Sequence, residues 1–135
     1  MLITRLTEKQ REFLENPFVG VVTEHRPDGT LHTTPVWVDA DHGAQLSFNT
    51  VRGRTKERDL ARDPQVSVLV VDPDDPYRWL SVSGKARLED EGADEQIDRL
   101  AQKYLGEERY PARAPGEKRV TVKIEPEKVD SRGLD

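Results

Sequence analysis

Residues 66–84 read VSVLVVDPDDPYRWLSVSG, which predicts two strands joined by a turn. Valines occupy every second position from 66 to 70, and of the alternate positions Ser67, Leu69 and Val71 two are apolar, which is typical of a strand in the middle of a sheet. The acidic, proline-containing segment 72–76 predicts a rigid turn, and a long strand is expected from Tyr77 to Glu89. Gly84 lies inside that strand, where a missing side chain suits a bulge or the corner of a barrel.

Shorter elements are expected on both sides of this pair of strands. The expected strands cover 18–23, 31–39, 45–50 and 120–124, with turns at 25–29 and 41–43. The expected helices run from a capping box at Thr7 and Gln10 to Glu15, from Arg54 to Asp63, and from Ala93 to Leu105 before Gly106. Pro35 cannot donate to a strand ladder, so it marks an edge or a break. About six strands and two or three short helices, without βαβ alternation, predict a single mainly β (α+β) domain over 1–135, built on an antiparallel barrel.

The composition fits one small core and excludes cysteine chemistry. Hydrophobic residues make up 34% of the chain and charged residues 35%, so a partner subunit would help to bury the apolar surface. The net charge of −5 opposes binding to nucleic acid or to an anionic membrane, so any anion site must be local. The absence of cysteine excludes disulfides and thiolate nucleophiles. Without thiols, any redox chemistry would need a bound cofactor. Because no apolar run has the length of a signal sequence, we expect a cytoplasmic protein.

Positive charge is concentrated in the segment 51–58, VRGRTKER, where an expected strand gives way to an expected helix. Backbone N–H groups at the start of the helix, together with Arg54 and Lys56, are suited to bind one phosphate. Gly53 would allow the backbone and the ligand to approach closely. The alternative interpretation is a solvated helix face, since runs of charge are common on exposed helices.

Aromatic and polar strand residues extend the candidate site. Tyr77 and Trp79 share one face of a strand, where they are suited either to stack on a planar ring or to pack in the core. The polar residues 32–34, next to Pro35, suit contacts with the polar edge of a heterocycle, although threonines are also ordinary strand residues.

Other classes of site find no support in the sequence. His25, His32 and His42 have neither the i, i+4 spacing nor the carboxylate motif of a metal site, and we predict no bound metal. The glycine fingerprint of dinucleotide folds, the phosphate loop of nucleotide hydrolases and the nucleophile elbow of α/β-hydrolases are all missing.

A series of short motifs runs along almost the whole chain. They are Arg26-Pro27-Asp28-Gly29, Thr34-Pro35-Val36-Trp37, Phe48-Asn49-Thr50, Gly53-Arg54 with Lys56, Asp63-Pro64, Pro76-Tyr77-Arg78, Ile97-Asp98-Arg99-Leu100, Lys103-Tyr104-Leu105-Gly106, and Tyr110-Pro111 with Pro115-Gly116-Glu117. With these motifs the sequence resembles the pyridoxamine-phosphate-oxidase-like family, and within it the deazaflavin-dependent branch. This likeness is specific for the fold and less specific for the substrate.

The resemblance implies a split β-barrel homodimer that holds coenzyme F420, a deazaflavin, or in relatives FMN, in a groove between the subunits. It implies that Arg54 and Lys56 bind the cofactor phosphate. It also implies that Tyr77 and Trp79 close the pocket, either of their own chain or of the partner subunit. The residues that it places along the ring or the ribityl chain are His32, Thr34, Pro35, Val36, Asn49 and Thr50. It carries over no catalytic acid or base.

The implied activity is hydride transfer between reduced coenzyme F420 and a conjugated small molecule such as an enone, a quinone or a tetrapyrrole. An FMN-dependent oxidoreductase of the same fold and a non-catalytic carrier or sensor of the cofactor are the alternatives. The additional cations Arg52 and Arg58 favour the deazaflavin, because its tail beyond the phosphate is anionic.

Overall fold

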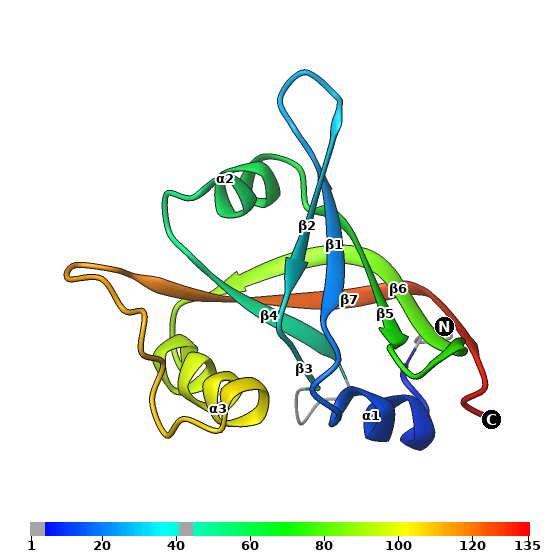
Figure 1. Cartoon of the computed structure of the whole chain (residues 1–135). Coiled ribbons are helices and arrows are strands. Elements are labelled where there is room, and N and C mark those ends of the chain that lie inside the picture. The colour runs from blue at the N-terminus through cyan, green and yellow to red at the C-terminus, as the bar shows by residue number, and fades with distance from the viewer. Residues whose placement is uncertain (1–4, 41–44) are drawn as a thin grey trace.

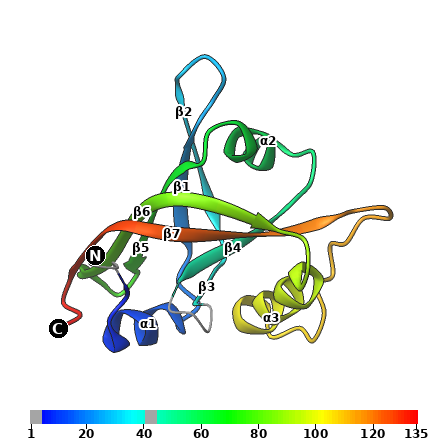
Figure 2. The same cartoon turned by 180° about the vertical axis from the view of Figure 1, so that it is seen from behind.

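The computed structural model describes residues 5–40 and 45–135, which form one curled antiparallel sheet with three helices (Figure 1). The strands are β1 (Gly20–His25), β2 (Leu31–Val36), β3 (Val38–Ala40), β4 (Leu46–Val51), β5 (Gln65–Asp72), β6 (Asp75–Glu89) and β7 (Arg119–Arg132). The helices are α1 (Glu8–Leu14), α2 (Thr55–Arg62) and α3 (Ala93–Leu105). The strand order is β2-β1-β5-β6-β7-β4-β3, and opposite views show the sheet curling into a half-barrel (Figure 1, Figure 2). The expected antiparallel barrel with short helices is confirmed, while the turn expected at 41–43 lies outside the described residues.

The two long strands predicted from 66–84 lie at the centre of this sheet. β5 pairs with β1 and β6, and β6 pairs with β5 and β7. Val66, Val68 and Val70 are buried, whereas Leu69 on the opposite face keeps 40% of its surface exposed. β5 is therefore apolar on both faces, but this chain fully covers only one of them.

Gly84 forms the bulge that its position predicts. The register between β6 and β7 shifts at this point, because Ser83 pairs with Lys128 whereas Gly84 pairs with Pro126. A Cβ atom built on Gly84 would lie 2.0 Å from the backbone carbonyl oxygen of Glu125. The close approach of the two backbones therefore requires glycine.

The strand expected at 31–39 is interrupted at Trp37. The part before it, β2, pairs with β1 at one edge of the sheet, and the part after it, β3, pairs with β4 at the other edge. Pro35 accordingly lies on an edge strand, where its missing N–H is tolerated. With this division residues 5–40 and 45–135 hold seven strands where about six were expected. β7 also runs beyond the expected end at 124, because β6 pairs with it up to Arg132.

The helices are placed so that two of them border one region of the sheet. α1 begins at the predicted capping box, where the Gln10 N–H donates to Thr7 Oγ1 at 3.2 Å and the Thr7 N–H donates to Gln10 Oε1 at 2.8 Å. α2 packs against β1 and β4, and α3 packs against β4 and β7 before ending at Gly106, whose φ is 72°. No helix in the described part of the chain is long and apolar enough to cross a membrane. β4 therefore lies between α2 and α3, and the candidate site forms there.

Candidate functional site

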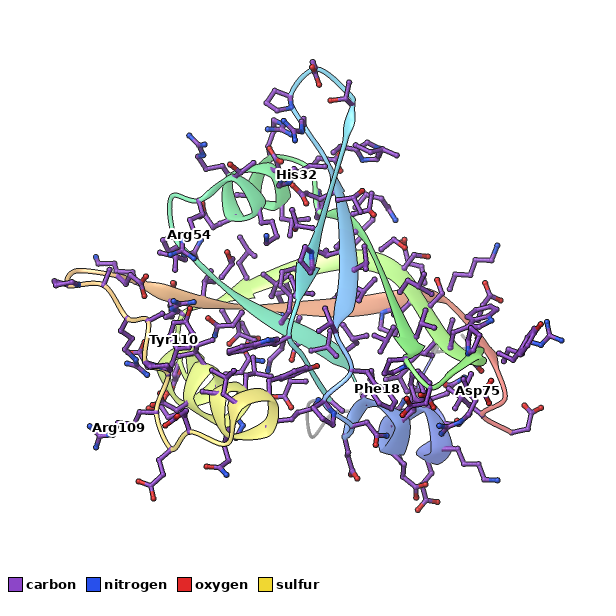
Figure 3. The ribbon with its side chains drawn as sticks, in the orientation of Figure 1. Phe18, His32, Arg54, Asp75, Arg109 and Tyr110 are labelled. Atoms are coloured by element: carbon purple, nitrogen blue, oxygen red, sulfur yellow. The ribbon has the colours of Figure 1, made fainter. Side chains whose placement is uncertain are left out.

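A pocket of about 700 Å³ lies between α2, α3 and strands β2 and β4. Cofactor and ligand sites commonly have volumes of about 300–1,000 Å³. Figure 3 labels His32 and Arg54 towards the α2 side of this region and Tyr110 towards the α3 side. The residues that line the pocket are Val19, His32, Pro35, Val36, Trp37, Asn49, Thr50, Gly53, Arg54, Thr55, Lys56, Arg58, Ile97, Leu100, Tyr110 and Arg119. The structure thus brings most of the predicted site residues together, and Thr34, Tyr77 and Trp79 are the ones that do not line the pocket.

Positive side chains gather where β4 leads into α2. Arg54 is the N-cap residue of α2, and its side chain makes no capping hydrogen bond to the first N–H groups of the helix. Arg54, Lys56 and Arg58 line the pocket from this junction, and Arg119 adds a buried guanidinium from β7. Gly53 precedes them with a φ of 93°, in the region that favours glycine, and so allows the tight turn into the helix. The arrangement offers converging positive charge on one wall of the pocket.

Lys56 is held in place by Thr34. The half-buried Lys56 ammonium donates from Nζ to Thr34 Oγ1 at 2.8 Å. Burial lowers the pKa of Lys56, the negative charge of Glu24 opposes this shift, and the positive charge of Arg54 adds to it. Thr34 therefore contributes to the site by holding Lys56. Burial destabilises the charged form of Lys56, and an anion bound in the pocket would stabilise that form again.

Glu117 is shared between two cations of the pocket. Arg54 Nη2 lies 3.1 Å from Glu117 Oε1, and Arg119 Nη2 lies 2.9 Å from Glu117 Oε2. The guanidinium of Arg119 also lies over the ring of Tyr110, at 4.7 Å from the ring centroid. Glu117 is therefore the internal counter-ion of this wall, and it orients both arginines.

Arg52 does not belong to this wall. Its guanidinium contacts Asp90 at 2.8 and 3.1 Å and Glu57 at 3.0 Å, and both contacts raise the pKa of Arg52 further. Of the two additional cations expected to bind the tail of a deazaflavin, only Arg58 lines the pocket.

An aromatic cluster that was not predicted as part of the site also lies at the pocket, beside Arg119. The ring of Trp37 stacks on Tyr104 at 5.3 Å with an interplanar angle of 7°, and Tyr110 meets Trp37 edge-on at 5.9 Å. Trp37 and Tyr110 line the pocket. The break after Pro35 is the sequence signal that marks Trp37, because a residue between two strands is free to turn inward, whereas nothing local marks the loop residue Tyr110.

Asn49 is fixed by a polar network at the base of the pocket. Its Nδ2 donates to the Ala93 carbonyl at 2.9 Å and to Gln96 Oε1 at 3.0 Å, and its Oδ1 accepts from Arg119 Nη1 at 3.4 Å. The buried Thr50 follows on the same strand. The predicted polar lining at 49–50 is therefore present, with the Asn49 amide already engaged by α3.

Tyr77 and Trp79 lie elsewhere in the single chain. Tyr77 is 67% exposed, with the Arg132 guanidinium 5.2 Å from its ring centroid, so core packing is wrong for this residue. Trp79 is half-buried beside Leu69 and Val71, in a second hollow of about 330 Å³. Their contact with a cofactor through the partner subunit stays a prediction.

Lys103 and Tyr104 clamp the chain around the break at Trp37. The Tyr104 hydroxyl accepts from the Val38 N–H at 3.0 Å and donates to the Phe18 carbonyl at 2.7 Å. Lys103 Nζ donates to the carbonyl of Val38 at 2.7 Å and to that of Leu14. Burial lowers the pKa of Lys103 to about 8 and raises the pKa of Tyr104 to about 12.

These two shifts predict how the stability depends on pH. Above about pH 8 the folded protein releases the Lys103 proton, whereas the unfolded chain keeps it up to about pH 10.4, so the Lys103 contribution to the free energy of unfolding rises with pH over this range. Above about pH 10 the Tyr104 contribution falls, because the unfolded chain releases a proton that the folded protein retains. Urea unfolding of the wild type and Lys103→Met across this range measures the difference. A difference in stability that is constant with pH would contradict the assignment to Lys103.

The chain is similar to known proteins in both sequence and fold. The sequence matches the family model described as pyridoxamine 5'-phosphate oxidase over residues 6–133. Among solved structures the chain is similar to one titled F420 Reductase, with 28% identity and a TM-score of 0.77 over 93% of this chain and 98% of the other. It is also similar to the conserved hypothetical protein Rv2991 of Mycobacterium tuberculosis, with 25% identity and a TM-score of 0.73 over 96% of this chain and 86% of the other.

A third similarity is informative for the fold alone. General Stress Protein 26 of Bacillus anthracis has 21% identity and a TM-score of 0.71 over 95% of this chain and 94% of the other. The chain matches none of the curated proteins with which it was compared. Since the family model spans nearly the whole chain and the sheet has the corresponding half-barrel topology, the chain belongs to the pyridoxamine 5'-phosphate oxidase family.

Proposed function

We propose that the pocket binds coenzyme F420 and that the protein transfers a hydride between the reduced cofactor and a conjugated small molecule such as an enone, a quinone or a tetrapyrrole. The observation that carries this proposal is that cationic and aromatic side chains line the same pocket of about 700 Å³. A phosphorylated planar cofactor has the matching chemistry at its two ends. When bound, the deazaflavin supplies the hydride chemistry, and the protein supplies binding and orientation.

The residues present fit such a molecule. Arg54, Lys56 and the uncapped N-terminus of α2 suit the phosphate. The polar and apolar residues that face the pocket on β2 and β4 suit the ribityl chain and the ring. These are His32, Pro35, Val36, Asn49 and Thr50, with Thr34 acting through Lys56.

Deazaflavin is preferred to FMN on two grounds. Arg58 adds a pocket-lining cation beyond the two that suit the phosphate, and F420 carries further negative charge in its tail. One similar structure, at 28% identity, is titled F420 Reductase. FMN is the alternative cofactor, because it also presents a planar ring, a ribityl chain and a phosphate.

A homodimer is part of this proposal. Val21 is directly opposite Leu69 in the sheet, and Val71 is opposite Trp79, so these four side chains form a continuous apolar patch on β1, β5 and β6. Val19, two residues before Val21, lines the pocket and is 50% exposed. A second copy seated on this patch would therefore lie beside the pocket, where its Tyr77 or Trp79 is suited to cover the cofactor ring.

The experiment that tests the function combines binding with turnover. Purified protein is titrated with F420 and with FMN while the cofactor fluorescence is followed, and reduced F420 is then mixed with a quinone acceptor. We expect tighter binding of F420 than of FMN, and reoxidation of F420 that depends on protein concentration. Binding without turnover would support the carrier function, and binding of neither cofactor would contradict the proposal.

A further inference from the structure

A cluster of three metal-ligating side chains lies behind the cationic wall. Glu24 on β1 and His32 on β2 are directly opposite each other in the sheet, and Asp59 reaches them from α2. Potential ligand atoms of the three residues all lie within 4.8 Å of one another. Figure 3 shows His32 beside α2, the helix that supplies Asp59. Three separate elements thus converge on one point.

Two carboxylate oxygens in this cluster are buried without a partner. The side chain of Glu24 has 0% of its surface exposed and that of Asp59 has 5%. Glu24 Oε2 contacts His32 Nδ1 at 2.8 Å, but among the residues that the structure describes no donor reaches Glu24 Oε1 or Asp59 Oδ2. Buried carboxylate oxygens without a partner are costly, so their position indicates that a positive group belongs between them.

The neighbouring cations do not fill this role. Lys56 donates to Thr34 Oγ1, and its charge acts on Glu24 only from a distance. Arg62 lies 3.4 Å from the other oxygen of Asp59, Oδ1, and donates to the His25 carbonyl.

We propose that Glu24, His32 and Asp59 form a binding site for one divalent transition-metal ion. One imidazole nitrogen and two carboxylates are a donor set that zinc, manganese and ferrous iron accept in proteins, and the two unpartnered oxygens supply the negative charge. The imidazole of His32 is 18% exposed and also faces the pocket, which gives the ion a route of entry. The metal site shares His32 with the pocket, whereas Glu24 and Asp59 do not line it.

Zinc titration of the cofactor-free protein tests this site. After treatment with a chelator, Zn²⁺ is added and binding is followed by calorimetry, with Asp59→Asn and Glu24→Gln as the altered proteins. Each amide keeps the shape of the side chain and is able to donate to the remaining carboxylate, so we expect both variants to fold. His25→Gln is the matched control, because His25 faces a carboxylate, Asp63, at 3.5 Å outside the cluster.

We expect one zinc ion per chain in the wild type and in His25→Gln, and affinity at least about 10-fold weaker in both amide variants. Wild-type protein that binds no zinc in a saturable way would overturn the proposal, and so would unchanged affinity in both amide variants. If the wild type binds no zinc and Asp59→Asn is more stable than the wild type, Glu24 and Asp59 share a proton instead of a metal ion, and the proposal is overturned. These outcomes do not depend on whether the pocket binds F420.

Discussion

Replacement of Gly84 by alanine is expected to lower the free energy of unfolding by about 3 kcal/mol. The added Cβ would lie 2.0 Å from the Glu125 carbonyl oxygen, 2.9 Å from the Glu125 carbonyl carbon and 2.9 Å from the Glu127 nitrogen. All three atoms belong to the backbone of β7, so no side-chain rotation relieves the clash. β6 and β7 must separate at the bulge, which weakens the ladder that joins them.

Urea unfolding followed by circular dichroism measures this loss. Ser83→Ala is the matched control, because Ser83 is the preceding residue of the same strand and is only partly buried. We expect the control to change stability by no more than about 0.5 kcal/mol. Equal stabilities of Gly84→Ala and Ser83→Ala would show that the bulge accommodates a side chain and that the backbone contact is not tight.

The second large effect concerns binding of the cofactor. Arg54→Ala and Lys56→Ala are each expected to cost about 1.5–3 kcal/mol of cofactor affinity, the scale of a hydrogen bond to a charged group. The double variant then loses between about 3 and 6 kcal/mol if the two contributions add, and about 1.4 kcal/mol corresponds to a tenfold change in affinity. Fluorescence titration with F420 measures these affinities.

The surroundings of Lys56 and Arg54 determine which of the two variants loses more affinity. Lys56 is half-buried and already held by Thr34, so it loses little side-chain freedom when the phosphate binds. Arg54 is 56% exposed and paired with Glu117, so part of its contribution is offset by breaking that pair. We therefore expect Lys56→Ala to cost more than Arg54→Ala. Arg26→Ala, at the exposed tip of the β1–β2 hairpin, is the control of equal charge change, and a loss of affinity there as large as at Lys56 would mean that only net charge matters.

Local patterns in the sequence predicted the elements that depend on local chemistry. The alternation at 66–70 placed a central strand, the capping box at Thr7 placed the start of α1, and Gly84 placed the bulge. In each case the physical cause lies within a few neighbouring residues. The concentration of cations at 51–58 likewise marked a real wall of the pocket, since Arg54, Lys56 and Arg58 face it.

Features that depend on distant pairing were not predictable in this way. The division of strand 31–39 at Trp37 arises because β2 and β3 pair at opposite edges of one curled sheet. The stacking of Trp37 on Tyr104 joins residues 67 positions apart in the chain. Arg52 and Arg58 were both expected to add positive charge to the site, yet Asp90, brought near by the fold, pairs with Arg52. The position of Trp79 beside Leu69 rather than in the pocket also depends on strand register.

The cluster of Glu24, His32 and Asp59 likewise depends on distant pairing and could not be predicted from the sequence. None of these residues has a helical or motif-like spacing relative to another, which is why the histidines predicted no metal site. Glu24 and His32 meet only because the hairpin register places them opposite each other, and Asp59 joins them only because α2 packs against β1.

The central claim is that Arg54 and Lys56 bind the phosphate of a planar redox cofactor, and a thermodynamic cycle tests it most directly. The affinities of F420 and of its dephosphorylated chromophore are measured for the wild type and for the double variant Arg54→Ala, Lys56→Ala. We expect removal of the phosphate to cost the wild type about 3 kcal/mol more than it costs the double variant, which keeps only the α2 N-terminus and Arg58. A phosphate contribution that is equally large in both proteins would contradict the account.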